Sequence, residues 1–338
     1  MVGEPTAVHD ASTSDRANAW PTLDVVIPMY NEARVLPALL RSLGETFAPE
    51  MCRHHRLSHV TCIFVDDGSR DGSVQIVQAS RPATLGVRIV RLSRNFGHQA
   101  AVTAGIANSC SDLVTVIDAD LQDPPPFILE MIKKWRSGCE VVHAIRRNRK
   151  EGRVKVALYW CFYRFYRLLT PIDVPVDSGD FCLMSRRVVD ELNRLPEKVR
   201  FPRGLRSWVG FRQETIAYDR PPRFAGETRY TFMNLYQLAT EGIASLSLLP
   251  LKVAQVLSLL FMLLTAGGVT LLGLGLFHAT DVRAQISFLT ILMLLSNSVI
   301  LFCLYILGAY LGRAYLEIKG RPSYIVAEII QPDAAQQP

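Results

Sequence analysis

The chain has 338 residues, a formal net charge of +6 and a mean hydropathy of +0.17. This length permits one sizeable catalytic domain plus a further segment, and the mean hydropathy is high for a soluble enzyme. Seven cysteines without a Cys-x-x-Cys spacing argue against a disulfide framework and against a zinc site. The basic residues gather in 146–167, in 200–206 and beside two apolar segments, so anionic lipid or a phosphorylated substrate explains the charge as well as nucleic acid does. We expect no nucleic-acid partner.

Residues 1–21 are predicted to form a flexible leader. They include Asp10, Asp15 and Arg16 and lack the apolar stretch of a signal peptide. We therefore expect no export signal at this end.

Residues 22–230 alternate short apolar runs with polar turns and helix-compatible segments. The runs are 23–27, 61–65, 87–92 and 113–117, and they are rich in β-branched residues. Repeated strand and helix units of this kind predict an α/β domain with a mostly parallel sheet. In such sheets, ligands bind beyond the carboxyl ends of the strands, so the residues after each run are the candidates for a site.

Carboxylates follow three of these runs directly. Glu32 follows the first run, Asp66 and Asp67 follow the second, and Asp118 and Asp120 follow the fourth. Crowded carboxylates repel one another unless a cation neutralises them, and oxygen ligands suit Mg²⁺ or Mn²⁺, which keep positions open for a diphosphate. The alternative is a set of solvated acidic turns. The chain has no P-loop motif, and no Gly-x-Gly-x-x-Gly follows a strand in this domain.

Two apolar segments, 253–277 and 286–310, are each long enough to span a bilayer. They predict a transmembrane hairpin within residues 250–312, the alternative being a buried helical hairpin of a soluble core. Residues 231–249 are apolar with scattered polar positions, which favours interfacial amphipathic helices over core helices. Basic residues flank the outer ends of the hairpin, whereas its loop has only Arg283. This bias predicts that the catalytic domain, both termini and a tail of residues 313–338 are cytoplasmic.

Three motifs together resemble those of the family 2 inverting glycosyltransferases, which have a GT-A fold with a Rossmann-like, mostly parallel sheet. The motifs, in chain order, are Val25-Val26-Ile27-Pro28-Met29-Tyr30-Asn31-Glu32, Val65-Asp66-Asp67-Gly68-Ser69 and Asp118-Ala119-Asp120-Leu121-Gln122-Asp123-Pro124-Pro125. The resemblance extends from about residue 22 to 326. With two C-terminal spans, the chain is similar to the polyisoprenyl-phosphate glycosyltransferases, which include dolichol-phosphate mannose synthases, bactoprenol glucosyltransferases and undecaprenyl-phosphate aminoarabinose transferases.

The resemblance implies transfer of a sugar, with inversion, from a nucleotide-diphosphate sugar, expected to carry uracil, to undecaprenyl phosphate. The product would be a polyprenyl-monophosphate sugar for cell-envelope glycans, made at the bacterial inner membrane by a multi-pass protein. The implied nucleotide-sugar residues are Pro28, Tyr30, Asn31, Glu32, Asp67, Asp118, Ala119, Asp120, Arg146, Arg223 and Arg229. The implied metal ligands for Mg²⁺ or Mn²⁺ are Asp118, Asp120 and Gln122. Arg146, Arg164 and Arg203 would bind the acceptor phosphate, and Asp118, Asp120 and Asp180 would be catalytic, with the orienting of the acceptor left open between Asp120 and Asp180.

Two positions depart from the family pattern, because Cys182 stands where arginine is expected and Arg206 stands where a small apolar residue is usual. Two other functions are the alternatives. A processive polysaccharide synthase would show a Gln-x-x-Arg-Trp motif and more spans, and a non-catalytic lipid-binding scaffold does not require the acidic motifs. The sugar and the oligomeric state stay open, a homotetramer being one possibility.

Overall fold

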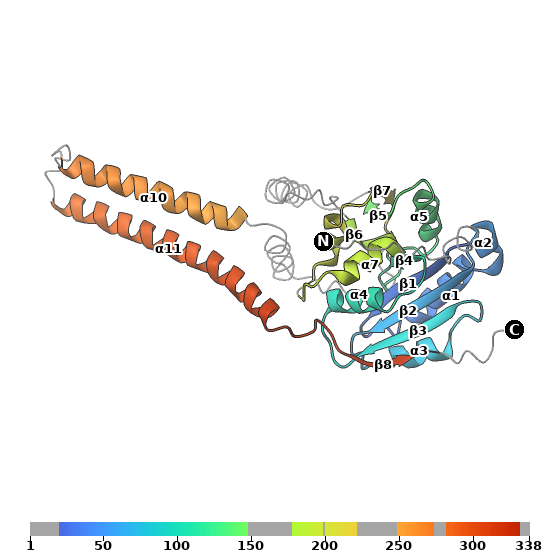
Figure 1. Cartoon of the computed structure of the whole chain (residues 1–338). Helices are drawn as coiled ribbons and strands as arrows, with labels where there is room; N and C mark the ends of the chain where they lie inside the picture. The colour runs from blue at the N-terminus through green and yellow to red at the C-terminus, as the bar shows by residue number, and fades with distance from the viewer. Residues whose placement is uncertain (1–19, 148–177, 199, 222–248, 274–281, 332–338) are drawn as a thin grey trace, which may run out of the picture.

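A computed structural model describes residues 20–147, 178–198, 200–221, 249–273 and 282–331. Figure 1 shows a domain built on a β-sheet, from which two long helices extend side by side. The described chain therefore has two parts of different character, a folded α/β domain and a helical pair.

Eight strands form one mixed sheet in the order β7-β5-β6-β4-β1-β2-β3-β8. The strands are β1 (Thr22–Met29), β2 (His59–Asp66), β3 (Gly86–Leu92), β4 (Leu113–Val116), β5 (Val141–Arg146), β6 (Ser178–Ser185), β7 (Gln213–Tyr218) and β8 (Val326–Ile330). The pairs β1–β2, β1–β4, β2–β3 and β5–β7 are parallel, and the pairs β3–β8, β4–β6 and β5–β6 are antiparallel. The predicted α/β fold with a mostly parallel sheet is confirmed.

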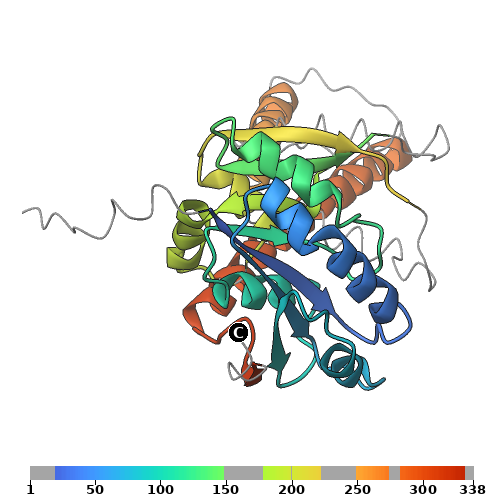
Figure 2. The ribbon, with the colours of Figure 1, turned by 90° about the vertical axis from the view of Figure 1, so that its right-hand side faces the viewer.

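Helices cover both faces of the sheet (Figure 2). The domain helices are α1 (Leu36–Thr46), α2 (Pro49–His54), α3 (Ser73–Ala79), α4 (His98–Ala107), α5 (Phe127–Trp135), α7 (Arg186–Arg194) and α8 (Pro202–Trp208). Apolar side chains of α1, α3 and α5 join one buried cluster, and those of α4, α7 and α8 join another on the opposite face. Because both faces are covered, β1 is buried along almost its whole length, as its continuous apolar run requires.

Helix α4 lies unusually close to the sheet because it carries Gly105. A Cβ at this position would overlap the side chain of Val26 on β1. The absence of a side chain lets the helix pack against the strand, and this fixes His98 at the beginning of α4 beside the carboxyl ends of the strands.

The four predicted strands correspond to β1 to β4, with ends within two residues of the predicted ones. The sequence did not reveal β5 to β8. In particular, residues 313–338 were expected to form a tail, whereas β8 within this segment pairs with β3 at the edge of the sheet. The expected domain boundary at residue 230 thus leaves out one strand of the catalytic sheet.

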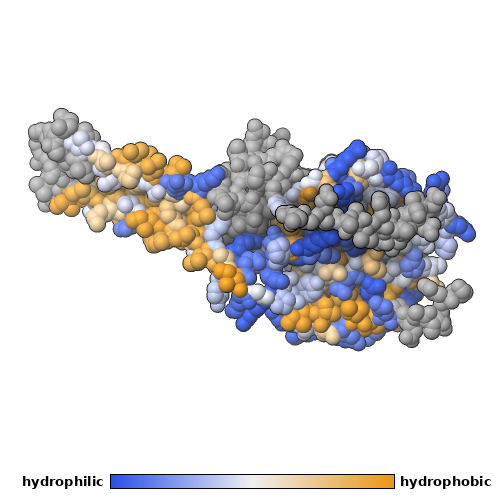
Figure 3. All heavy atoms as spheres, in the orientation of Figure 1, coloured by the Kyte–Doolittle hydropathy of each residue, from blue (hydrophilic) through white to orange (hydrophobic). Residues whose placement is uncertain are grey.

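The apolar pair consists of α10 (Leu249–Gly273) and α11 (Val282–Ile318). Among the described residues, these two helices are long and apolar enough to cross a membrane, and most of their described apolar side chains are exposed. Figure 3 shows hydrophobic residues over much of their surface. Unpartnered apolar surface of this size marks contact with lipid or with another protein. The predicted interfacial helices of 231–249 lie outside the described residues, apart from Leu249, which begins α10.

Candidate active site

The loops after β1, β2 and β4 meet at one edge of the sheet. Adjacent registers pair Met29 with Asp66 and Val26 with Val116, so the residues after these strands are neighbours. Parallel strands bring their carboxyl ends together, and the polar motifs of the sequence are therefore gathered in space.

The loop after β1 is tied to the loop after β2 by hydrogen bonds. The Asn31 backbone N–H donates to Ser69 Oγ at 3.0 Å, and the Arg70 N–H donates to Asn31 Oδ1 at 2.9 Å. The Glu32 N–H donates to Ser73 Oγ at 3.0 Å. Asn31 has a φ of 56°, a left-handed conformation that asparagine tolerates better than most residues. Tyr30, next to it, leaves 37% of its surface exposed.

Asp67 holds a third loop in place. Its two carboxylate oxygens accept the backbone N–H groups of Phe96 at 2.7 Å and of Gly97 at 2.9 Å. Burial raises the pKa of Asp67, and these two hydrogen bonds lower it. The neighbouring Gly68 has a φ of +77°, and a Cβ there would lie 2.9 Å from the backbone of Arg94. Only glycine fits this close approach of the two loops.

The loop after β4 is a tight turn braced from within. Leu121 has a φ of 60°, and the Gln122 N–H donates to Asp120 Oδ1 at 3.1 Å. The Asp118 N–H donates to Asp123 Oδ2 at 3.2 Å, and the Tyr218 hydroxyl donates to Asp123 Oδ1 at 2.7 Å. Asp123 is thus a brace of the turn, a role that the sequence did not indicate.

The carboxylates of this turn are electrostatically crowded. Burial raises the pKa of Asp118, and the negative charges of Asp180 and Asp120 raise it further, against the lowering effect of His98 and Arg220. Burial and the charge of Asp118 also raise the pKa of Asp123 to about 7. Such a site is stabilised by a cation, so the donor chemistry of Asp118 and Asp120 fits a divalent ion. No group of three or more His, Cys, Asp and Glu side chains placed to hold a metal occurs among the described residues, so an ion here would need other ligands as well.

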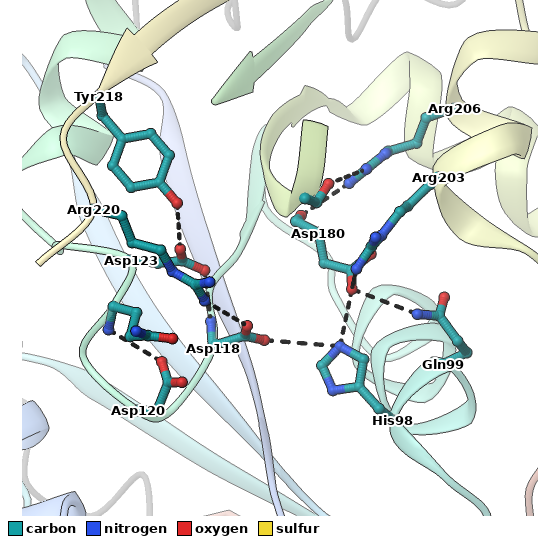
Figure 4. A network of polar contacts seen from close by, with 12 residues as sticks. His98, Gln99, Asp118, Asp120, Asp123, Asp180, Arg203, Arg206, Tyr218 and Arg220 are labelled. Atoms are coloured by element: carbon teal, nitrogen blue, oxygen red, sulfur yellow. Dashed lines mark hydrogen bonds and ion pairs between the residues drawn. The ribbon is translucent and has the colours of Figure 1, made fainter. Parts of the chain in front are cut away.

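Asp180, on β6, lies on the opposite side of this space within a polar network (Figure 4). Arg203 binds both of its oxygens, from Nε to Oδ1 and from Nη2 to Oδ2, each at 2.8 Å. His98 Nε2 lies 3.0 Å from Asp180 Oδ2 and 3.7 Å from Asp118 Oδ1. The network therefore links the β6 carboxylate to the turn after β4.

These contacts set the charges of the network. Although burial acts to raise the pKa of Asp180, Arg203 and His98 hold it well below its usual range. Burial lowers the pKa of His98, but its hydrogen bond to Asp180 and the charges of Asp180 and Asp118 raise it to about 9 overall. Asp180 is consequently an ionised anchor between two cations.

The structure brings most of the predicted site residues together and leaves some undescribed. Pro28 lies near the end of β1, and the other described nucleotide and metal candidates except Arg146 lie on the loops after β1, β2 and β4: Tyr30, Asn31, Glu32, Asp67, Asp118, Ala119, Asp120 and Gln122. Arg203 lies on α8, and Arg146 ends β5 with its side chain outside the described residues. Arg164, Arg223 and Arg229 lie outside the described residues altogether.

Two cations near Asp118 were assigned no role from the sequence. Arg220 Nη2 lies 4.0 Å from Asp118 Oδ2, just after β7, and His98 begins the helix that follows β3. The rule that sites form beyond the carboxyl ends of strands could have found His98. This residue follows 87–92, the one predicted strand that has no acidic motif after it. Nothing in the sequence identified β7, and therefore nothing pointed to Arg220.

Comparison with known proteins gives a consistent family assignment. Residues 24–192 match the model of the family described as glycosyl transferase family 2. An uncharacterized glycosyltransferase, YkcC, of Bacillus subtilis is 41% identical over 89% of this chain and 92% of its own length. The SfII prophage-derived bactoprenol glucosyl transferase of Shigella flexneri is 33% identical over 90% of this chain and 97% of its own. A prophage bactoprenol glucosyl transferase homolog of Escherichia coli is 32% identical over 91% and 99% of the two chains.

Proposed function

Because this chain belongs to glycosyl transferase family 2, we propose that it moves a sugar from a nucleotide-diphosphate sugar to the phosphate of a polyprenyl phosphate. The proposal rests mainly on one observation: the same chain contains a GT-A domain, whose strands end in acidic loops, and a pair of exposed apolar helices. A soluble acceptor would not require the helices. Relatives named for bactoprenol glucosyl transfer match this chain along its catalytic and helical parts alike.

The donor is proposed to bind across the loops after β1, β2 and β4. Pro28, Tyr30, Asn31, Glu32 and Asp67 would receive the base and ribose, with uracil as the expected base. Asp118, Ala119 and Asp120 would face the diphosphate, to which Arg146, Arg223 and Arg229 would contribute positive charge. The hydrogen bonds between the first two loops support this role, because they pre-organise the surface that the nucleoside would meet.

A divalent cation, Mg²⁺ or Mn²⁺, is proposed to be held by Asp118 and Asp120 with Gln122. When bound, it would neutralise the negative charge of the departing nucleoside diphosphate. The crowding of the carboxylates supports this assignment, since burial and then the negative charges of Asp180 and Asp120 raise the pKa of Asp118.

The chemistry itself needs no strong base. A polyprenyl phosphate is already anionic at neutral pH, so its oxygen can attack the anomeric carbon directly, with inversion. Both oxygens of Asp180 are bound by Arg203 and His98, so this carboxylate is suited to holding cations and not to accepting a proton. Arg203 and His98 are then the groups that align the acceptor phosphate, with Arg146 and Arg164 as further candidates.

The helices α10 and α11 are proposed to cross the bacterial inner membrane as a hairpin, with the catalytic domain and both termini in the cytoplasm. Their exposed apolar surface supports contact with lipid. This arrangement would keep the site at the membrane surface, where the acceptor phosphate lies.

The test is sugar transfer by the purified full chain in micelles that contain undecaprenyl phosphate. Radiolabelled UDP-, GDP- and dTDP-sugars are supplied with Mg²⁺, with Mn²⁺ or with a chelator, and the organic phase is counted. We expect metal-dependent labelling of the lipid from one donor class and loss of labelling in Asp120→Asn. Labelling of no lipid from any donor, in a preparation that binds nucleotide, would contradict the proposal.

A further inference from the structure

Arg206 is a buried arginine in the wall of the site. Only 1% of its surface is exposed, and it is among the largest fully buried side chains of the domain. Burying a guanidinium is costly unless acceptors surround it. Its acceptors are backbone carbonyls, because Nη1 donates to the oxygen of Asp180 and Nη2 to that of Gly179, both at 2.9 Å. Nη1 also donates to Cys182 Sγ.

Arg206 and Arg203 lie one turn apart on α8 and bind the same residue of β6 from two sides. Arg203 binds the carboxylate of Asp180, while Arg206 binds its main-chain carbonyl and that of the preceding glycine. The side chain and the backbone of Asp180 are thus held from one short helix (Figure 4). A residue fixed at both places cannot rotate to follow a ligand, so it presents a fixed carboxylate to Arg203 and His98.

The positions 182 and 206, where the sequence departs from the family pattern, are in contact with each other. Cys182 is fully buried and leaves room beside β6 for the guanidinium that arrives from α8. The small residue on the strand and the large one on the helix are therefore complementary in volume.

We propose that Arg206 is a positioning residue, which fixes the Gly179–Asp180 backbone and thereby aligns Arg203 and His98 for the acceptor phosphate. The inference rests on the proposed function. It adds a residue that touches no substrate, and it places the control of acceptor binding on α8. The loops after β1 and β2, which would receive the nucleoside, are held by hydrogen bonds that involve neither Arg206 nor Asp180.

The test compares the full chain with Arg206→Met and Arg206→Lys in the micelle assay, varying donor and acceptor separately. Methionine keeps most of the volume and removes all the donors, whereas lysine keeps a positive charge and a donor. Gln213→Leu is the matched control. Gln213 Nε2 donates to the carbonyl of Arg206 at 2.8 Å, so this variant disturbs the same packing without removing a bond to Gly179 or Asp180. The nucleotide-binding stoichiometry gives the folded fraction of each preparation.

We expect Arg206→Met to raise the KM for undecaprenyl phosphate by about tenfold or more, with the KM for the donor changed by less than about threefold. The acceptor KM of Arg206→Lys should lie between those of the parent and Arg206→Met. Gln213→Leu should leave both KM values within about threefold of the parent. A merely structural role would lower the folded fraction and leave the acceptor KM of the folded enzyme unchanged.

The inference is overturned if the folded Arg206→Met enzyme has the parent's acceptor KM, or if donor and acceptor KM rise together. Should the methionine variant bind no nucleotide, the lysine variant decides by the same criterion. A parent chain that transfers no sugar would overturn the proposed function, and this inference with it, whereas an active parent with an unaltered Arg206→Met variant overturns the inference alone.

Discussion

At the scale of single residues, some carboxylates of the acidic motifs brace the loops and others face the site, and the sequence does not show which does which. Asp67 accepts hydrogen bonds from backbone N–H groups, and Asp123 accepts one from the Tyr218 hydroxyl. The side chain of Asp118, by contrast, is partly exposed. The position of all three after buried strands could be predicted from the alternation of apolar runs and polar turns. Which carboxylate braces a loop depends on contacts with residues 29 to 95 positions away, such as Phe96 for Asp67 and Tyr218 for Asp123. Such contacts leave no local pattern.

Asp67→Asn should weaken both the loop and donor binding. An amide replaces one acceptor oxygen with an N–H group that faces the N–H of Phe96 or Gly97, so one buried donor loses its partner. We expect a loss of about 1–3 kcal/mol in unfolding free energy. This loss is measured as a lower thermal midpoint in detergent, and the weaker donor binding is measured by nucleotide titration. Glu130→Gln, at an exposed pair with Lys133, is the control and should change stability by less than about 1 kcal/mol. Equal effects of the two variants would contradict the bracing role.

Arg203→Met should affect the acceptor and not the donor. The guanidinium makes a two-pronged contact with Asp180 and is partly exposed, so its loss removes a cation from the acceptor side. We expect the acceptor KM to rise by about tenfold and nucleotide affinity to change by less than about threefold. Titration of nucleotide binding and initial rates at varied lipid concentration separate the two. A selective loss of nucleotide affinity would show that Arg203 serves the donor.

At the scale of elements, the first four strands were predicted because each is an uninterrupted apolar run followed by a polar turn. Strand β6 escapes this rule, since its sequence begins Ser178-Gly179-Asp180, residues that usually avoid strands. Asp180 belongs to the site, while Ser178 and the residues from Cys182 onward pair with β4 and β5. Strand β7, at the edge of the sheet, begins with three polar residues and has no long apolar run, which gives a weak signal. Functional and edge strands are therefore the elements that sequence reasoning loses.

The β5–β7 pair should make the stability of the domain depend on pH. His143 on β5 is buried, and its Nε2 lies 2.8 Å from Gln213 Oε1 on β7. Burial, with the charge of Arg206, lowers the pKa of His143 to about 4 from 6.5. The folded state then binds fewer protons than the unfolded state between these values. The contribution of His143 to stability is therefore full above about pH 6.5 and falls by roughly 3 kcal/mol as the pH drops through 4, whereas Asp123, whose pKa is raised to about 7, contributes in the opposite direction.

Thermal midpoints measured from pH 7.5 to pH 4.5 test this dependence. The midpoint of His143→Leu should rise relative to that of the parent as the pH falls through this window, whereas replacing the exposed His59 with glutamine should give a curve parallel to the parent's. Parallel curves for the parent and His143→Leu would contradict the assignment.

At the scale of the whole molecule, the second apolar helix leads back into the catalytic domain. After α11, the chain crosses to the sheet edge, where the Ser93 N–H donates to the oxygen of Ile325 at 2.9 Å and β8 pairs with β3. Ser93 begins the loop that Asp67 holds. The segment after α11 thus connects the helical pair to β3, the strand that leads into the loop held by Asp67. The sequence of residues 313–338 did not reveal this connection, because β8 is short and isolated in the sequence.

Ending the chain after Tyr324 should destabilise the catalytic domain. It removes the whole β3–β8 ladder and the packing of Val326 and Ile330 against the two apolar clusters. We expect a lower thermal midpoint and weaker nucleotide binding, because the loop at Ser93 loses its support. Glu328→Ala removes only an exposed ion pair with Arg91 and should change stability by less than about 1 kcal/mol. A truncated chain with the parent's midpoint would contradict a structural role for β8.

Direct transfer of the sugar to the lipid phosphate can be recognised from its two products. After reaction with the accepted donor and undecaprenyl phosphate, the released nucleotide is separated by chromatography and the glycolipid is weighed by mass spectrometry. We expect one nucleoside diphosphate to be released for each undecaprenyl-monophosphate sugar formed. Release of a nucleoside monophosphate with a sugar on an undecaprenyl diphosphate would contradict it.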